Sequence, residues 1–339
     1  MIDKKKRSRI INAAVVCVLA LLCVAEIFII ASYTASFEHE NAAKRFSNGT
    51  RYAQITVLLP ESADFTVDKI MYFRYNLEKA LVEKAITSGS ENGRLYADAY
   101  SAVENASIRS ESARSTSARV TYIGGDYELF HDEFRTLPKI EKDVNHDRVL
   151  LSRSAAWQLY GGTELYDLPV TIGEDSLLVG GVYDDYKGKA YEEYYGDLTS
   201  VTADIHRDPD RAVTCYELLL VNPVTDFAKN MVKDCLEVED GTCVIIENSA
   251  RFSALENIKR IPRLLSADET LPTGVDLTPE EMMARRGEKV ASALTALLLV
   301  TAIYPAIWFF ILLLRLIKLI KKLADRLIIG KIKDKLSYS

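Results

Sequence analysis

The chain has 339 residues, with 42 lysine and arginine residues against 48 aspartate and glutamate residues, which gives a net charge of −6. The negative charge gathers in the middle. Residues 34–288 carry 28 basic and 44 acidic side chains, whereas residues 1–33 and 289–339 have net charges of +3 and +7. The strong negative charge of residues 34–288 argues against nucleic-acid binding, because phosphate backbones attract basic surfaces and repel acidic ones. It is long enough to bury a core as one large domain or two small ones.

Two long apolar segments, residues 10–33 and 290–314, bracket the acidic middle. Each is long enough to cross a hydrocarbon core of ~30 Å as a helix. Basic residues cluster on their outer sides, at Lys4, Lys5, Lys6, Arg7 and Arg9 before the first and at Arg315, Lys318, Lys321, Lys322, Arg326, Lys331, Lys333 and Lys335 after the second. We therefore predict two transmembrane helices in a bacterial-type cell membrane, with residues 1–9 and 315–339 in the cytoplasm and residues 34–289 extracytoplasmic.

The first apolar segment has a second interpretation, since a basic start followed by an apolar run is also typical of a cleaved secretory signal. Its 24 residues are long for such a signal, and no clean small-x-small cleavage site follows before Ser36. We therefore favour a membrane helix.

Glu26 lies inside this apolar segment. Its carboxylate either reaches the membrane interface or contacts a polar group of a partner helix, and both interpretations stay open.

The expected elements of the middle fall into two α/β segments around a β-rich one. The first has a strand at 52–59, a helix that follows Thr66 and reaches residue 85, and a strand at 95–103. The second has a strand at 216–221, a helix at 223–236 and a strand at 242–247. Between them we expect strands at 118–123, 148–152, 170–172 and 176–183, and a helix at 152–159 capped by Ser152 or Ser154.

A tyrosine-rich stretch follows these elements at residues 183–197. Rigid aromatic side chains suit protein contacts, so its five tyrosines are candidate partner contacts. The alternative is a solvated hairpin tip whose rings cover its own base. The five are Tyr183, Tyr186, Tyr191, Tyr194 and Tyr195.

The five cysteines and four histidines have no metal-ligand spacing, so we expect no metal and no cofactor. Three cysteines lie in the predicted extracytoplasmic part, which permits one disulfide, and Cys235 with Cys243 is the candidate pair. The sequence contains no P-loop, GxSxG or HExxH motif, so we predict that the chain is not an enzyme and does not hydrolyse ATP. His206 and Asp208 are the best site for the less favoured alternative, an anchored extracytoplasmic hydrolase.

Three segments follow one another in a fixed order: VTYIGGDYELF at 120–130, DRVLLSRSAAWQLYGG at 147–162 and LPVTIGEDSLLVGGVYDD at 168–185. Together they resemble the extracytoplasmic core domain of MacB-type ABC transporter permeases. The residues that match the family pattern are Val149, Leu150, Ser152, Ala156, Leu159, Tyr160 and Gly161 in the second segment, and Val179, Gly180, Gly181 and Val182 in the third.

The resemblance implies a membrane protein with two transmembrane helices and an α+β external domain. In that domain a split porter-like α/β subdomain, residues 50–106 and 212–262, surrounds a β-rich sabre-like insertion, residues 107–211. It also implies mechanotransmission, in which the external domain moves with a separate ABC ATPase, and partners in the form of the lipid bilayer, an ATPase and permease subunits, as a homo- or hetero-oligomer.

The sequence departs from the family pattern after the second span. A complete permease of this type has four membrane helices and a cytoplasmic coupling segment, and we expect the second half to be missing here. Residues 315–339 are instead basic and amphipathic, which suits either the cytoplasmic membrane surface or a cytoplasmic partner. The leading hypothesis is a non-catalytic permease-like subunit that works with an ATPase in trans. The alternative is an extracytoplasmic binding, sensor or scaffold protein derived from a permease.

Overall fold

The computed structural model describes residues 4–37, 42–46, 51–86, 94–131, 148–239, 241–266 and 270–337, with the side chains of 4–6, 9, 44 and 323–337 left out. The chain forms two compact units. The helical unit comprises Met1–Ser36, Phe252–Leu265 and Glu288–Ser339, and the α/β unit comprises Phe37–Arg251 and Ser266–Gly287.

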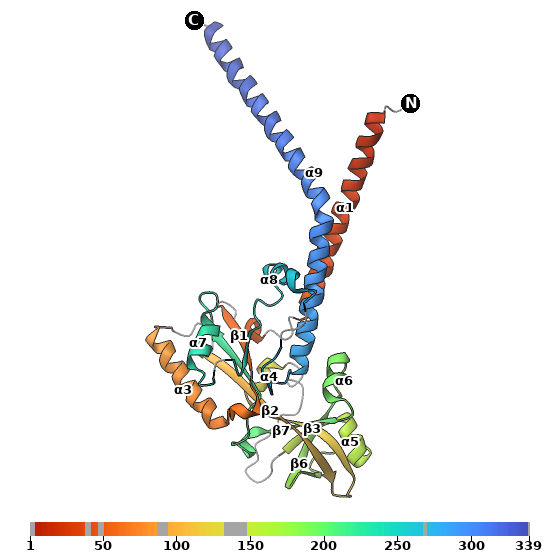
Figure 1. The fold of residues 1–339 in the computed structure, drawn as a ribbon, viewed down its shortest axis with the longest axis vertical. Coiled ribbons are helices and arrows are strands. Elements are labelled where there is room, and N and C mark those ends of the chain that lie inside the picture. The colour runs from red at the N-terminus through yellow and green to blue at the C-terminus, as the bar shows by residue number, and fades with distance from the viewer. Residues whose placement is uncertain are drawn as a thin grey trace. The chain divides into compact units, whose positions relative to one another are not determined.

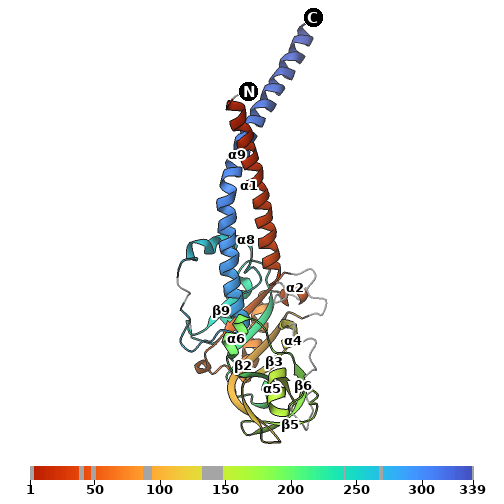
Figure 2. The same cartoon turned by 90° about the vertical axis from the view of Figure 1, so that its right-hand side faces the viewer.

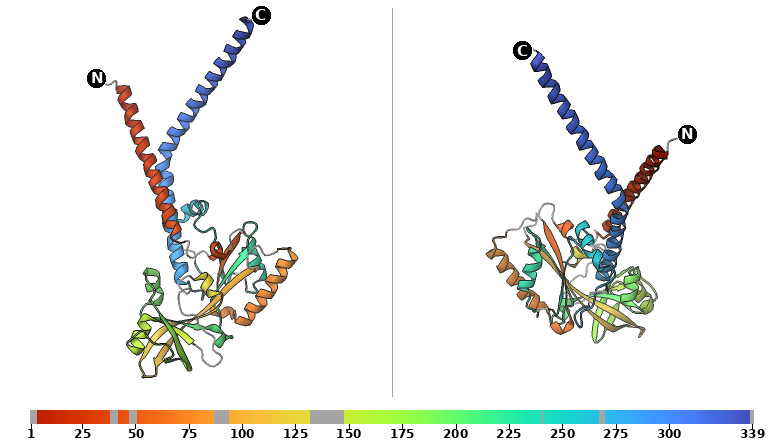
Figure 3. Two further views of the ribbon diagram at one scale, coloured as in Figure 1. Left: turned by 180° about the vertical axis from the view of Figure 1, so that it is seen from behind. Right: turned by 45° about the horizontal axis from the view of Figure 1, so that its top comes forward.

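The helical unit contains α1 (Lys4–Ala35), α8 (Ala254–Arg260), the 3-10 turn η5 (Ile261–Arg263) and most of α9 (Pro279–Ser337). Among the described residues, two stretches, Ile10–Ala35 and Pro279–Lys322, are long and apolar enough to cross a membrane, so this part of the chain is that of a membrane protein with two spans. Figures 1 and 3 show α1 beside part of α9. The tail expected as a separate segment continues α9 without a break, and its side chains beyond Lys322 lie outside the described residues.

In the described part of the α/β unit, nine strands join into one hydrogen-bonded network, in the order β3-β7-β4-β6-β5-β2-β8-β1-β9. The strands are β1 (Tyr52–Leu58), β2 (Tyr96–Ser110), β3 (Ser115–Gly125), β4 (Arg148–Ser152), β5 (Pro169–Ile172), β6 (Asp175–Tyr183), β7 (Thr199–Asp204), β8 (Cys215–Val221) and β9 (Val244–Glu247). The helices and 3-10 turns are α2 (Ala42–Phe46), η2 (Glu61–Ala63), α3 (Val67–Glu83), α4 (Tyr127–Phe130), α5 (Arg153–Tyr160), α6 (Lys189–Tyr195), η4 (Ile205–Arg207) and α7 (Phe227–Cys235).

The first half of the unit is the sheet β2-β8-β1-β9, in which neighbouring strands are antiparallel. Strands β1 and β8 are buried along their whole length, which fits their central position. Helices α3 and α7 pack against each other and lie on the same side of this sheet (Figure 1). The inward face of α3 has helical spacing, and its buried residues are Val67, Ile70, Phe73, Leu77 and Leu81.

The second half is a small closed ring of strands. The pairings run β2-β3-β7-β4-β6-β5 and return to β2, because the long β2 pairs with β3 along most of its length and with β5 at its end. Closure leaves these strands without an unpaired edge. Helix α5 lies beside this ring (Figure 2), and its expected cap is confirmed at Ser152, whose hydroxyl accepts the N–H of Ala155 (3.3 Å).

The expected strands and helices of the middle are present, although β2 ends at Ser110 and not at residue 103. The serine-rich residues 107–117 are the two arms and turn of the β2–β3 hairpin. Residues 189–195 form helix α6, which overturns the alternative of a solvated hairpin tip. The carbonyl of Gly188 accepts the N–H of Glu192 (3.0 Å) and starts this helical turn. Strand β7 was not expected from the sequence. Strand β2 crosses the expected subdomain boundary at residues 106–107, and α8 belongs to the helical unit.

Candidate functional site

A buried ion pair holds the first turns of α9 to the rest of the α/β unit. Thr278 caps this helix by accepting the backbone N–H of Glu281 through its hydroxyl (3.3 Å). The Glu281 carboxylate accepts two hydrogen bonds from Arg251, from Nη1 to Oε2 (2.5 Å) and from Nη2 to Oε1 (2.9 Å). The two side chains are only 7% and 5% exposed. A two-pronged pair at this depth fixes the helix start, because removing either partner leaves a poorly compensated buried charge.

Neighbouring groups keep this pair in place. Arg285, one turn along α9, donates Nε to Oε1 of Glu281 (2.7 Å). Arg251 also donates Nη1 to the Asn248 side-chain oxygen (3.1 Å). Asn248 in turn donates its amide nitrogen to the Thr56 hydroxyl on β1 (2.8 Å), so the turn that carries Arg251 is tied to the sheet.

The five tyrosines form one cluster at α6 and the end of β6. The Tyr186 ring stacks on Tyr191 (centroids 4.8 Å apart, 8° between planes) and on Tyr195 (5.9 Å, 9°). Tyr194 meets Tyr195 edge to face (5.1 Å, 86°). Tyr183 is buried and its hydroxyl lies 2.6 Å from that of Ser200, while the other four rings are half-buried. The rings therefore pack largely on one another, and part of four of them stays accessible.

This cluster also contacts α9 directly. The Tyr191 hydroxyl donates to Glu280 Oε1 (3.1 Å), and Glu193 of α6 forms an ion pair with Arg286. Together with Arg251, these contacts hold α9 by its residues 280, 281 and 286, about one and a half helical turns. The turn that carries Arg251 and helix α6 thus both contact the first turns of α9.

Burial sets the protonation state of the cluster. It raises the pKa of Tyr183 and of Tyr194 far above the ordinary value, and it raises the pKa of Tyr195 to about 12. The guanidinium of Arg119 lies over the Tyr194 ring (4.2 Å to the centroid) and opposes part of the rise there. All three phenols are protonated near neutral pH, so they act as neutral hydrogen-bonding groups.

In the helical unit, Glu26 faces α9. Its Oε1 accepts a hydrogen bond from the Thr301 hydroxyl (3.1 Å), while its buried Oε2 has no hydrogen-bond partner in the described part of the chain. The polar group that Glu26 contacts thus lies on the second span of the same chain. Such a bond between two membrane helices contributes modestly to their association.

The candidate disulfide is not formed in this structure. Cys235 is a free thiol, 7% exposed in the core on α7, and burial raises its pKa. Cys243 lies just before β9 and is half-buried. The bridge between them stays a prediction that mapping of non-reduced peptides can test.

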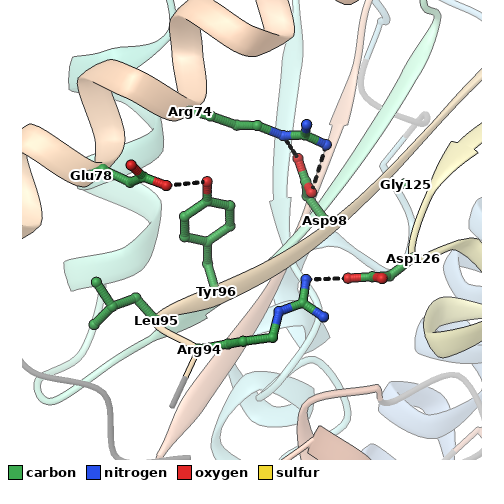
Figure 4. A pocket seen from close by; sticks show the side chains of 8 residues that line it. All are labelled: Arg74, Glu78, Arg94, Leu95, Tyr96, Asp98, Gly125 and Asp126. Carbon is green, nitrogen blue, oxygen red and sulfur yellow. Dashed lines mark hydrogen bonds and ion pairs between the residues drawn. The ribbon is translucent and has the colours of Figure 1, made fainter. Parts of the chain in front are cut away.

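A polar pocket of about 470 Å³ opens beside α3 and the start of β2 (Figure 4). It is lined by Arg74, Glu78, Arg94, Leu95, Tyr96, Asp98, Gly125 and Asp126. Arg74 donates Nε and Nη2 to the two carboxylate oxygens of Asp98 (2.7 and 2.9 Å). Tyr96 donates its hydroxyl to Glu78 Oε1 (2.9 Å), and Arg94 forms an ion pair with Asp126. The pocket therefore offers two guanidinium groups and three carboxylates, held by partners on α3 and on strand ends.

The arrangement around His206 and Asp208 gives little support to the hydrolase alternative. The His206 ring packs edge to face on Tyr100 (centroids 6.3 Å apart), and Asp208 forms an ion pair with Arg211 (3.1 Å). Among the described residues, no group of three or more His, Cys, Asp or Glu side chains could hold a metal ion.

Sequence reasoning singled out Tyr191 and Glu26 but missed Arg251 and Glu281. A local signal for the helix start existed, since Thr278 and Pro279 precede two acidic residues, which is typical of a helix N-terminus. The partnership with Arg251 had no such signal, because the two residues are separated by 30 positions.

No family model and no curated protein matches the chain. Among solved structures it is similar to the extracellular domain of the noncanonic ABC-type transporter YknZ from Gram-positive bacteria. The identity is 13% and the TM-score 0.35, over 57% of this chain and 99% of the other. It is also similar to the periplasmic region of MacB from Actinobacillus actinomycetemcomitans. Here the identity is 11% and the TM-score 0.39, over 63% of this chain and 95% of the other.

Proposed function

We propose that this chain is a non-catalytic ABC-transporter permease-like subunit, in which the α/β unit and the membrane spans exchange conformational change through α9. The observation that carries the proposal is the buried pair of Arg251 and Glu281. It ties the α/β unit to the beginning of a helix that continues without a break into the second span. A continuous helix that is fixed at its start passes a rotation or displacement of the α/β unit on to the membrane span, whereas a flexible linker would absorb much of it.

The proposal places the α/β unit outside the cell membrane and both termini in the cytoplasm. The basic residues before the first span and after the second support this orientation. In this orientation the C-terminal part of α9 is available to the inner membrane surface or to a cytoplasmic partner. ATP hydrolysis then comes from a separate ATPase, because the sequence has no P-loop.

Affinity purification of the full chain from its native membranes in mild detergent tests this proposal. We expect a P-loop ATPase, or a permease with a cytoplasmic coupling segment, to copurify. A Glu281→Ala variant should retain that partner, whose binding site we place on the cytoplasmic side, but should lose any effect of the chain on the partner's ATPase rate. Arg207→Ala, which removes a more exposed ion pair with Asp175, is the matched control. Recovery of the chain alone would contradict the proposal.

A second candidate function, an extracytoplasmic binding or sensor protein, is favoured by the pocket beside α3. Its volume of about 470 Å³ is in the range of small-ligand sites, and its two guanidinium groups and three carboxylates would complement a zwitterion such as an amino acid or dipeptide. Calorimetric titration of the full chain with dipeptides tests this function, with Arg94→Ala as the variant that should lose binding. The accessible faces of the tyrosine cluster are a further candidate surface for a partner protein.

A further inference from the structure

The segment of α8 and η5 lies against α9 at the start of the second span. Both elements belong to the helical unit, together with α1 and most of α9. Arg260 of α8 donates Nη2 to Oε1 of Glu288 on α9 (2.8 Å), and Figures 1 and 2 show α8 beside α9. Glu288 precedes Val290, where the apolar span begins, by two residues or ~3 Å of helix rise. The ion pair therefore places α8 at the level where a spanning helix leaves the hydrocarbon.

The outward face of this segment is apolar. Leu255 and Ile258, three residues apart on α8, are 62% and 44% exposed, and Leu265 just after η5 is fully exposed. The opposite side of α8 is buried, since Asn257 is only 1% exposed. Three large aliphatic side chains directed away from the unit, beside a membrane helix, match the apolar face of an interfacial helix.

The charge of this segment differs in sign from that of its surroundings. Residues 252–265 contain Lys259, Arg260 and Arg263 against the single acid Glu256, whereas residues 34–288 as a whole are strongly acidic. Lys259 and Glu256 form an ion pair (2.6 Å), and Arg263 is exposed at the end of η5. Basic groups beside exposed leucine and isoleucine suit an anionic headgroup layer, whereas an acidic surface is repelled by such a layer.

We propose that α8 and η5 form a membrane-surface anchor, in which Leu255, Ile258 and Leu265 insert into the lipid leaflet nearer the α/β unit. The occupant of this apolar face is thus the bilayer itself. The inference rests on the insertion of the two spans but not on the choice between transporter subunit and binding protein. In a membrane, this anchor would hold the start of the second span at the interface.

Photo-crosslinking in vesicles of phosphatidylethanolamine and phosphatidylglycerol tests this proposal on the full chain. A photoreactive benzoylphenylalanine replaces Ile258 or Leu265, and lipid adducts are measured by mass spectrometry after irradiation. The matched control is Val224, which is 61% exposed in the α/β unit. Leu299, 46% exposed in the second span, reports whether the protein is inserted.

We expect lipid adducts at positions 258, 265 and 299, and many-fold fewer at 224. If position 299 labels lipid while 258 and 265 label no more than 224, the spans are inserted but the anchor is refuted. Crosslinks from 258 and 265 to a protein chain would equally overturn it, because the occupant would then be a partner. Absence of adducts at 299 would show that the spans are not inserted, which contradicts the membrane topology as well as the anchor.

Discussion

Arg251 donates two hydrogen bonds to the carboxylate of Glu281 across a sequence distance of 30 residues, and the side chains are 7% and 5% exposed. Glu281 is the third residue of α9, and Arg251 follows a turn bonded to β1 through Asn248. The pair thus joins the central sheet to a helix whose later residues span the membrane. Because the pair is buried, we expect removal of Glu281 to destabilise the protein more than removal of the neighbouring Arg285, which is more exposed.

We expect Glu281→Ala to lower the free energy of unfolding by roughly 3–5 kcal/mol, the usual cost of breaking a buried pair. The substitution removes the acceptor of both Arg251 and Arg285 and leaves the buried Arg251 with Asn248 as a neutral acceptor. Urea unfolding of the full chain in detergent, followed by fluorescence, measures this loss.

Arg285→Ala is the matched control. Its side chain is 25% exposed, and Glu281 keeps both bonds from Arg251, so the expected loss is at most about 1 kcal/mol. Equal losses for the two variants would show that the buried pair does not carry the anchorage of α9.

Most elements of the α/β unit were predictable from sequence, because they are specified locally. Strand β4 (Arg148–Ser152) was predicted with its observed bounds, and Ser152 was one of two residues expected to cap the helix after it. Helix α3 was predicted from the spacing of its apolar residues. Alternating or helical apolar patterns and a capping serine need no distant partner to be recognised.

The rest depended on long-range pairing. Strand β7 has a mixed polar sequence, and it is a strand because β3 and β4 pair with its two edges. The tyrosine-rich residues 183–197 left a partner-contact surface and a solvated hairpin tip open, and helix α6 was not expected there. The contact of Tyr191 with Glu280 and the pair of Arg251 with Glu281 join residues far apart in sequence, and one sequence holds no signal for such partners.

The bond between Glu26 and Thr301 predicts a small coupling between the membrane helices. A double-mutant cycle of Glu26→Ala and Thr301→Ala should give a coupling energy of about 0.6 kcal/mol, and at most ~2 kcal/mol, in line with other hydrogen bonds between membrane helices. Reversible unfolding in mixed detergent and lipid micelles measures it. Thr301→Ser keeps the hydroxyl and should keep the coupling. A cycle that sums to zero would mean that the bond contributes nothing to helix association.

The tyrosine cluster predicts a loss of stability at alkaline pH. Burial raises the pKa of Tyr195 to about 12, whereas the phenol of the unfolded chain titrates near 10. The stabilisation is therefore fully present below about pH 10, and it falls between about pH 10 and 12, because the unfolded chain releases its proton first. Denaturant unfolding across this range should show the fall. Tyr195→Phe should reduce the slope, and an unchanged slope would contradict the assignment.

The backbone at Gly125 leaves no room for a side chain at the rim of the polar pocket. Its φ is +74°, and a Cβ at this position would lie 2.5 Å from the backbone oxygen of Asp98. The neighbouring β2 backbone would have to shift, and with it the carboxylate that holds Arg74. Gly125→Ala should therefore cost more than the 1–2 kcal/mol that a left-handed conformation alone costs a residue with a side chain.

Gly173 separates the two contributions to this cost. Its φ is +60°, and a Cβ there would meet no atom within 4 Å, so Gly173→Ala should lose only the conformational part. Thermal unfolding of both variants of the full chain in the same detergent gives the difference between them. A larger loss at Gly125 indicates that close packing against Asp98 fixes this rim of the pocket. Equal losses would mean that β2 yields to the added methyl group, and the pocket rim is then adaptable.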